Sequence, residues 1–297
     1  MINDLPEIEL FAQGHRACAG CGSALAMRLV LKAAGPDTTV CHATGCMEVV
    51  STPYPQTAWK IPWIHAAFEN AAAVASGVER ALKKLNKKVN VLAIGGDGGT
   101  FDIGLQALSG AIERGHDFCY VCYDNEAYEN TGIQRSGATP KYAATTTSPA
   151  GKVIHGKQEW NKQMPFIIAA HGAYVATANI AFPQDLVAKV QKGLSIKGPA
   201  YVQVMAPCQP GWKHESNIAI KISRLGFQTN VYPLYEIENG YLKINKRNDN
   251  PKPVEEFLKL QGRFKHLTSE QIKEIQQHVN QEYEKLIKLE ESKLRIF

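Results

Sequence analysis

The sequence predicts an α/β fold built around a parallel β-sheet, and three observations carry this prediction. Short apolar runs typical of strands alternate with helical segments from residue 22 to residue 207. Residues 89–123 read as strand, glycine turn, helix and strand, which is a connection that joins parallel strands with a right-handed crossover. A chain of 297 residues with 44% apolar side chains is also long enough to bury a substantial core.

The remaining elements follow the same alternation along the chain. Before the strand–helix–strand unit we expect a helix, a strand and a second helix, at residues 22–34, 38–43 and 68–85. Inside the unit, apolar residues at helical spacing from Phe101 to Ile112 mark the helix, and Gly115 ends it. After the unit we expect a strand, a helix and a strand, at residues 172–178, 183–194 and 200–207.

The character of the chain changes at about residue 212. Residues 266–294 predict a charged amphipathic helix that begins with a capping box of Thr268 and Gln271. We expect this helix to pack against the rest of the chain or to contact another subunit. The chain therefore divides into a binding domain, residues 1–211, and a C-terminal extension, residues 212–297, that packs on the same domain or on partner subunits.

Composition and charge argue against several classes of protein. No apolar stretch reaches the roughly 18 residues that a membrane helix needs, and the first ten residues lack the basic and apolar regions of a signal peptide. We therefore expect a cytoplasmic protein that binds no membrane. The net charge of +5 is spread along the chain without interleaved aromatic residues, which favours a solvated surface over one that binds nucleic acid.

Polar residues follow both strands of the unit at residues 89–123. Asp97 comes just after the first strand and Asn125 just after the second, and the carboxyl ends of parallel strands meet at one edge of a sheet. Mg²⁺ prefers such oxygen ligands and commonly adds phosphate oxygens. Glycines at positions 95, 96, 98 and 99 allow an anion to lie close to the backbone and to the N-terminus of the helix that follows. We therefore favour a site for Mg²⁺ and a diphosphate over two ordinary turns.

The seven cysteines, an odd number in a chain this long, are not typical of a disulfide framework and indicate reduced thiols. Cys18 and Cys21 form a C-x-x-C before the first helix. Cys119 and Cys122 form another inside a strand, where side chains three apart face opposite sides of the sheet and cannot share one ion. We expect these two, and Cys41 in an earlier strand, to be core residues.

Two further cysteines lie near the same ligand edge. Cys46 follows a glycine after a strand, and Cys208 lies at the proline-rich end of another strand. With Cys18 and Cys21 they form an acceptable set of ligands for a [4Fe–4S] cluster. A thioredoxin-like dithiol at the first C-x-x-C is the main alternative, although the strand that precedes such motifs is missing. A zinc site made of both C-x-x-C pairs is disfavoured by the strand geometry.

Long stretches of the chain carry a family resemblance over roughly residues 14–212. They are "GHRACAGCGSALAMR", "ATGCMEVVSTPYPQTAWKIPW", "GGDGGTFDIGLQALSGAIERGHDF", "YDNEAYENTGIQRSGATP" and "APCQPGW". Together they resemble the thiamine-diphosphate-binding β subunits of 2-oxoacid:ferredoxin oxidoreductases, and among them those of the pyruvate:ferredoxin oxidoreductases. The resemblance implies a thiamine-diphosphate-binding fold, with a mostly parallel sheet, helices on both faces and a C-terminal helical extension.

Matched position by position, the resemblance implies a set of site residues within the binding domain. The ligands of the [4Fe–4S] cluster fall on Cys18, Cys21, Cys46 and Cys208. The ligands of Mg²⁺ fall on Asp97, Asn125 and the carbonyl of Ala127, and the diphosphate cradle falls on Gly96, Gly98 and Gly99. Residues placed beside thiamine diphosphate are Thr44, Cys46 and Asn130, and Asn130 matches the residue that the family places near the thiazolium reaction centre, so it is the expected catalytic residue.

The resemblance also implies a reaction. In the family, a 2-oxo acid is decarboxylated and oxidised, its acyl group passes to coenzyme A, and electrons leave through the cluster to ferredoxin. Pyruvate, giving acetyl-CoA and CO₂, is the expected substrate, and oxalate, 2-oxoisovalerate and 2-oxoglutarate are the alternatives. Two functions from other classes are also considered: an electron-transfer module without thiamine chemistry, and a thiamine decarboxylase without an iron–sulfur cluster.

This chain is expected to be inactive alone. Thiamine enzymes need a glutamate beside the pyrimidine ring of the cofactor, and no glutamate of this sequence is a convincing candidate. In the family, partner subunits supply that glutamate and the substrate-binding residues, and a small ferredoxin-like subunit supplies further clusters.

Overall fold

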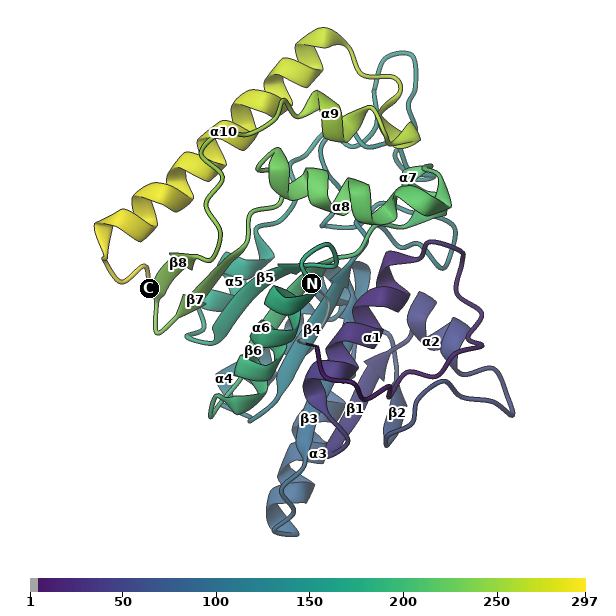
Figure 1. Cartoon of the computed structure of the whole chain (residues 1–297), viewed down its shortest axis with the longest axis vertical. Helices are drawn as coiled ribbons and strands as arrows, with labels where there is room; N and C mark the ends of the chain where they lie inside the picture. Colours follow the sequence, from purple (N-terminus) through teal and green to yellow (C-terminus); the bar gives the residue numbers. More distant parts are fainter. Residues whose placement is uncertain (1–4) are drawn as a thin grey trace.

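A computed structural model describes residues 5–297 of the chain. Its centre is one eight-stranded sheet in the order β2-β1-β3-β4-β6-β5-β7-β8, visible in Figure 1. The first six strands in that order are parallel, which confirms the predicted mostly parallel α/β fold. The strands are β1 (Thr38–Ala43), β2 (Trp63–Ala66), β3 (Asn90–Gly96), β4 (Cys119–Asp124), β5 (Tyr174–Asn179), β6 (Ala200–Met205), β7 (Tyr235–Glu238) and β8 (Tyr241–Ile244).

Helices cover both faces of the sheet, as expected. The first face is covered by α1 (Gly22–Ala34) and α6 (Pro183–Ser195), and the second by α3 (Ala71–Lys84), α4 (Leu105–Glu113) and α5 (Met164–Ala169). The remaining helices are α2 (Cys46–Ser51), α7 (Gln209–Trp212), α8 (Ala219–Gln228), α9 (Glu255–Leu258) and α10 (Ser269–Ser292), with a π-helix, η2 (Gly98–Ile103), and two 3₁₀ turns, η3 (Ser216–Ile218) and η4 (Gly262–Phe264). Among residues 5–297, no helix is both long enough and apolar enough to span a membrane.

Three cysteines are core residues, as predicted. Cys119 packs with the apolar side chains beneath α1 and α6, whereas Cys122 packs with those beneath α3 and α4. Both thiols are fully buried, and so is that of Cys41. The two members of this C-x-x-C therefore lie on opposite faces of β4, which confirms that they cannot share one ion.

One predicted helix is wrong in its first turn. Residues from Phe101 were expected to continue the helix that ends before Gly115, but η2 winds them as a π-helix, and α4 begins only at Leu105. The reason is the close approach of two glycines: a Cβ at Gly104 would lie 2.1 Å from the carbonyl oxygen of Gly99. The wide turn forms only because position 104 lacks a side chain, and single π-turns of this kind are frequent at functional sites.

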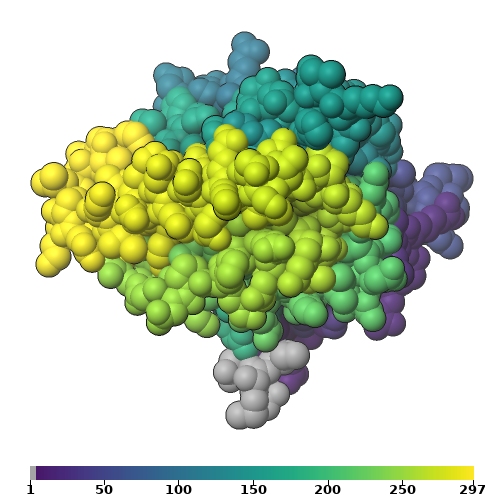
Figure 2. Space-filling model, turned by 90° about the horizontal axis from the view of Figure 1, so that it is seen from above, coloured from purple at the N-terminus to yellow at the C-terminus, as the bar shows by residue number. Residues whose placement is uncertain are grey.

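The C-terminal residues join the same sheet. β7 pairs antiparallel with β5, and β8 pairs antiparallel with β7. α10 begins with the predicted capping box of Thr268 and Gln271 and lies alongside β8. Figure 2 looks down on the face above the sheet and shows C-terminal residues running across it, beside the segment that follows β4. The hairpin of β7 and β8 was not predicted.

A buried carboxylate attaches this hairpin to the rest of the sheet. Glu236 of β7 accepts hydrogen bonds from the Tyr174 hydroxyl at 2.6 Å, from Lys192 Nζ at 2.8 Å and from the Asn245 amide. Burial raises the pKa of Glu236, but the hydrogen bonds from Lys192, Tyr174 and Asn245 outweigh it and lower the pKa to about 2. The ionised carboxylate therefore stabilises the folded chain.

We expect acid to remove this contribution. Because the pKa of Glu236 is lowered on folding, its stabilisation is present above pH 4.5 and is lost as the pH falls towards 2, where the folded carboxylate is also protonated. The contribution to the free energy of unfolding is on the order of 2–3 kcal/mol. In urea unfolding at a series of pH values, Glu236→Gln should be less stable at neutral pH and should depend less on pH below 4.5.

The matched control is Glu238→Gln, at an exposed carboxylate of the same strand that contacts the same Lys192. This variant should keep the pH dependence of the wild-type chain. An unchanged slope in Glu236→Gln would contradict the assignment.

Candidate active site

The predicted Mg²⁺ ligands lie together at the carboxyl ends of β3 and β4. One terminal atom of the Asn125 side-chain amide contacts both Asp97 and Ala127. It lies 2.8 Å from Asp97 Oδ1 and 3.1 Å from the Ala127 carbonyl oxygen. As nitrogen, it donates a hydrogen bond to each oxygen. As oxygen, it completes a group of three acceptors, and neighbouring ligands of an octahedral Mg²⁺ lie about 3 Å apart. In that orientation the three residues offer the kind of oxygen donors that Mg²⁺ prefers.

Asp97 is fully buried, so its charge needs compensation. Burial, and then the nearby Asp124, raises the pKa of Asp97 well above its ordinary value. Its second oxygen accepts a hydrogen bond of 2.5 Å from the Ser136 hydroxyl, and its first accepts one of 3.3 Å from the Asn125 backbone N–H. A bound divalent cation reverses such a pKa shift, because it favours the ionised carboxylate.

The glycines after β3 make room for neighbouring aromatic rings. A Cβ at Gly98 would lie 2.8 Å from the ring of Tyr128, whose hydroxyl donates to Asp102 at 3.0 Å. The stretch predicted as a diphosphate cradle consists of Gly96, the last residue of β3, and of Gly98 and Gly99, the first residues of η2. Tyr128 therefore covers this glycine-rich turn, a contact that the sequence analysis did not identify.

Thr44 and Asn130, expected beside the organic cofactor, lie in different surroundings. Thr44 follows β1 and is half-buried, with its Oγ1 2.7 Å from His65 Nε2 and within hydrogen-bond distance of the Ala66 carbonyl. Asn130 is exposed in the turn that the bridge between Tyr128 and Gln134 closes. Within residues 5–297, Asn130 forms no hydrogen bond with Asp97.

Backbone contacts bring the segment of Cys18 and Cys21 against that of Cys208. Cys21 is the N-cap of α1, and the next N–H, that of Gly22, donates to the Pro207 carbonyl at 3.1 Å, one residue before Cys208. Close approach of these segments requires Gly22, because a Cβ there would lie 2.7 Å from Pro207. Cys18 is exposed, whereas Cys21, Cys46 and Cys208 are half-buried.

The thiols affect one another electrostatically. Burial, followed by Glu129, Cys21, Asp97 and Cys18, raises the pKa of Cys46 to about 12. Within residues 5–297, no three Cys, His, Asp or Glu side chains are arranged as a ready-made metal-binding group. The donor chemistry of these thiols suits iron, which would bind them as thiolates.

A buried carboxylate beside these cysteines was missed by the sequence analysis. Both oxygens of Glu129 are buried, and the geometry of the described residues gives them no close hydrogen bond; burial raises the pKa of Glu129 to about 7, although the neighbouring Cys208 thiol opposes this shift. It lies against the backbone of Gly211, where a Cβ would come within 2.1 Å of Oε1. The only sequence signal is its position between the predicted metal ligand Ala127 and Asn130, three residues apart.

Comparisons with known proteins agree with this geometry. The family "Thiamine pyrophosphate enzyme, C-terminal TPP binding domain" matches residues 39–204, more than half of the chain. These residues include Asp97 and Asn125, together with β2 to β5 and nearly all of β1 and β6.

Curated relatives match almost the whole chain. The pyruvate synthase subunit PorB of Methanocaldococcus jannaschii is 56% identical over 290 residues, covering 95% of this chain and 97% of the relative. The subunit of the same name from Thermotoga maritima is 47% identical, covering 94% and 91%. The ketoisovalerate oxidoreductase subunit VorB of Pyrococcus abyssi is 48% identical, covering 97% and 95%.

A solved structure shares the fold. A chain of the 2-oxoglutarate:ferredoxin oxidoreductase from Magnetococcus marinus, solved with 2-oxoglutarate, coenzyme A and succinyl-CoA bound, matches with a TM-score of 0.59 at 20% identity. The match covers 74% of this chain and 82% of that one. The fold, the thiamine-binding domain and the nearly full-length relatives agree: the chain belongs to the thiamine-diphosphate-binding β subunits of the 2-oxoacid:ferredoxin oxidoreductases.

Proposed function

We propose that this chain is the β subunit of a pyruvate synthase, the pyruvate:ferredoxin oxidoreductase that converts pyruvate and coenzyme A to acetyl-CoA and CO₂. The observation that carries the proposal is the nearly full-length match to PorB subunits at up to 56% identity. The related VorB subunit, at 48% identity, favours 2-oxoisovalerate as the second candidate substrate.

Residues 1–211 are proposed to bind the cofactors. Thiamine diphosphate, when bound, supplies a nucleophilic carbon for decarboxylation of the 2-oxo acid. Asp97, Asn125 and the Ala127 carbonyl would hold Mg²⁺, and the glycine-rich turn that contains Gly98 would face the diphosphate. The buried Asp97 carboxylate, which lies beside the Asn125 amide and the carbonyl that this amide contacts, supports this assignment.

Cys18, Cys21, Cys46 and Cys208 are proposed to hold a [4Fe–4S] cluster, which supplies one-electron transfer when bound. The proximity of their segments supports the proposal, as does the mutual influence of the thiols. Cys18 is exposed, so the cluster would lie close to the protein surface. That placement suits delivery of electrons to a partner that carries further clusters, and finally to ferredoxin.

The first test is a substrate assay of the complete complex under anaerobic conditions. With coenzyme A and ferredoxin present, pyruvate should be oxidised with a higher kcat/KM than oxalate, 2-oxoisovalerate or 2-oxoglutarate. The isolated chain should show no activity, because partner subunits are proposed to supply the pyrimidine glutamate. Turnover by the pure isolated chain would contradict the proposal that partner subunits supply the glutamate. A higher kcat/KM with another 2-oxo acid would identify that acid, instead of pyruvate, as the substrate.

The second test concerns the metal. Asp97→Asn keeps the size of the side chain but removes the charge of the proposed ligand. Mutating a residue that only hydrogen-bonds to a metal ligand lowers metal affinity by about 10- to 100-fold. Loss of the ligand charge should therefore weaken Mg²⁺-dependent binding of thiamine diphosphate by more than about 100-fold. Calorimetry on the cofactor-free complex measures this. Asp117→Asn, at the opposite end of β4, is the matched control and should bind normally. Normal binding by Asp97→Asn would remove it from the site.

The third test concerns the cluster. Iron and sulfide content of the anaerobically purified complex should fall in Cys208→Ser, because a hydroxyl is a poor replacement for a thiolate ligand. Cys119→Ser is the matched control: it should keep its iron and lose about 1 kcal/mol or more of stability through core packing. Full iron in Cys208→Ser, or loss of iron from a folded Cys119→Ser, would overturn the ligand assignment.

A further inference from the structure

The loop that carries two of the proposed Mg²⁺ ligands has a strained backbone. Glu126, between Asn125 and Ala127, has φ of +64°, in the left-handed region that residues other than glycine rarely adopt. Such a conformation persists only where surrounding contacts impose it. In this conformation the Asn125 side chain contacts both Asp97 and the Ala127 carbonyl, so the geometry of the site depends on the contacts that hold Glu126.

The C-terminal extension holds the Glu126 side chain. Its carboxylate forms an ion pair and a hydrogen bond with the guanidinium of Arg263, in η4, which is 137 residues further along the chain. Arg263 is 2% exposed, and its Nε and Nη2 also donate to Gln261 Oε1 at 3.0 and 2.8 Å. Its carbonyl accepts a hydrogen bond of 3.0 Å from Ala144 N–H. These contacts fix the position of the guanidinium independently of its contact with the loop.

The same guanidinium supports a second contact to the loop. Its Cζ lies 4.0 Å from the ring centroid of Trp212, which is fully buried. The Trp212 indole Nε1 donates a hydrogen bond of 2.8 Å to the Asn125 carbonyl oxygen. Arg263 thus holds the loop directly at Glu126 and, through the stacked indole, at Asn125. A lysine has the charge but lacks the flat face that stacks on an aromatic ring.

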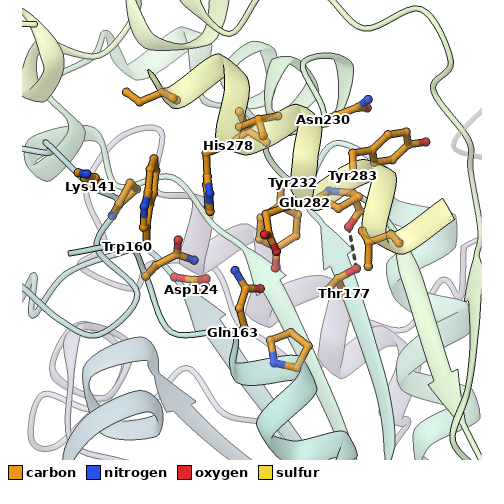
Figure 3. A pocket seen from close by; sticks show the side chains of 18 of the residues that line it. Asp124, Lys141, Trp160, Gln163, Thr177, Asn230, Tyr232, His278, Glu282 and Tyr283 are labelled. Atoms are coloured by element: carbon orange, nitrogen blue, oxygen red, sulfur yellow. Dashed lines mark hydrogen bonds between the residues drawn. The ribbon is translucent and has the colours of Figure 1, made fainter. Parts of the chain in front are cut away.

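Packing alone does not fix this side of the loop. Glu126 lines a cavity of 440 Å³ between the sheet and α10, whereas Asn125 and Ala127 do not. Figure 3 shows this cavity, with Asp124 on one side and His278 of α10 on the other. An open space supplies few van der Waals contacts, so specific polar contacts must fix the neighbouring loop.

Charge gives the pair a further role. Several carboxylates are gathered near the loop, and Arg263 acts electrostatically on three of them: Asp124, Glu126 and Glu129. Lys157 is the other cation that acts on Glu126, and its Nζ donates to the Thr139 carbonyl at 2.6 Å. Arg263 is the cation that contacts Glu126 directly, and without it the carboxylate would be buried without an ionic partner.

We infer that Arg263 is a positioning residue for the proposed Mg²⁺ site: through Glu126 and Trp212 it keeps Asn125 and Ala127 in the geometry that binds the ion. The inference rests on the proposed function. It gives the C-terminal extension a part in cofactor binding, although the extension contributes none of the proposed ligands.

The test uses the complete complex, purified anaerobically and freed of Mg²⁺ and thiamine diphosphate. In Arg263→Met, the Mg²⁺ concentration for half-saturation, measured by calorimetry with excess thiamine diphosphate, should rise about tenfold or more. At saturating Mg²⁺ the variant should regain a kcat close to that of the wild type, because the ligands themselves are intact. Arg263→Lys, which keeps the charge but not the stacking, should lie between the two.

Arg247→Met is the matched control. Arg247 also lies in the extension and pairs with Glu290 and Glu291, but it is half-exposed, so this variant should bind Mg²⁺ as the wild type does. If Arg263→Met does not fold, Arg263→Lys carries the test. A wild-type dependence on Mg²⁺ in the folded Arg263 variants would overturn the inference. A wild-type complex that binds no Mg²⁺ with thiamine diphosphate would instead overturn the proposed function.

Discussion

The site depends on one constraint: β3 and β4 are neighbouring parallel strands in fixed register. Gly96 pairs with Tyr123, so the residues that follow these strands, Asp97 and Asn125, emerge side by side at one edge of the sheet. A parallel connection forces this arrangement whatever the intervening helix contains. Two polar residues that are 28 positions apart in the sequence therefore lie together, and their side chains carry the oxygen atoms that a divalent cation prefers as ligands.

This constraint explains why much of the architecture could be predicted from the sequence. The helix at Gly22–Ala34 and the strand at Thr38–Ala43 have the predicted boundaries, because apolar periodicity and a glycine after the helix define them locally. The placement of Asp97 and Asn125 at one edge follows from strand order alone. The role of each residue towards a cofactor stays a prediction, because it depends on groups that the chain binds.

Other features depend on contacts between distant segments and had no local signal. Strand β2 has four residues and follows a proline, and among the described residues it pairs only with β1, so no alternating pattern marks it. The π-turn requires the Gly104 backbone to meet the Gly99 carbonyl. The position of Glu129 beside Cys208 follows from the fold, since the chain between them forms two further strands.

The extension and the site are also linked thermodynamically. If Arg263 lowers the free energy of the loop conformation that binds Mg²⁺, then bound Mg²⁺ must stabilise the contact of Arg263 with Glu126 and Trp212 by the same amount. The two contacts join residues 125 and 126 to segments that follow β6, so on this proposal cofactor binding and docking of the extension would favour one another. A strained residue such as Glu126 makes this coupling possible, because its conformation is imposed from outside the loop rather than favoured by the loop itself.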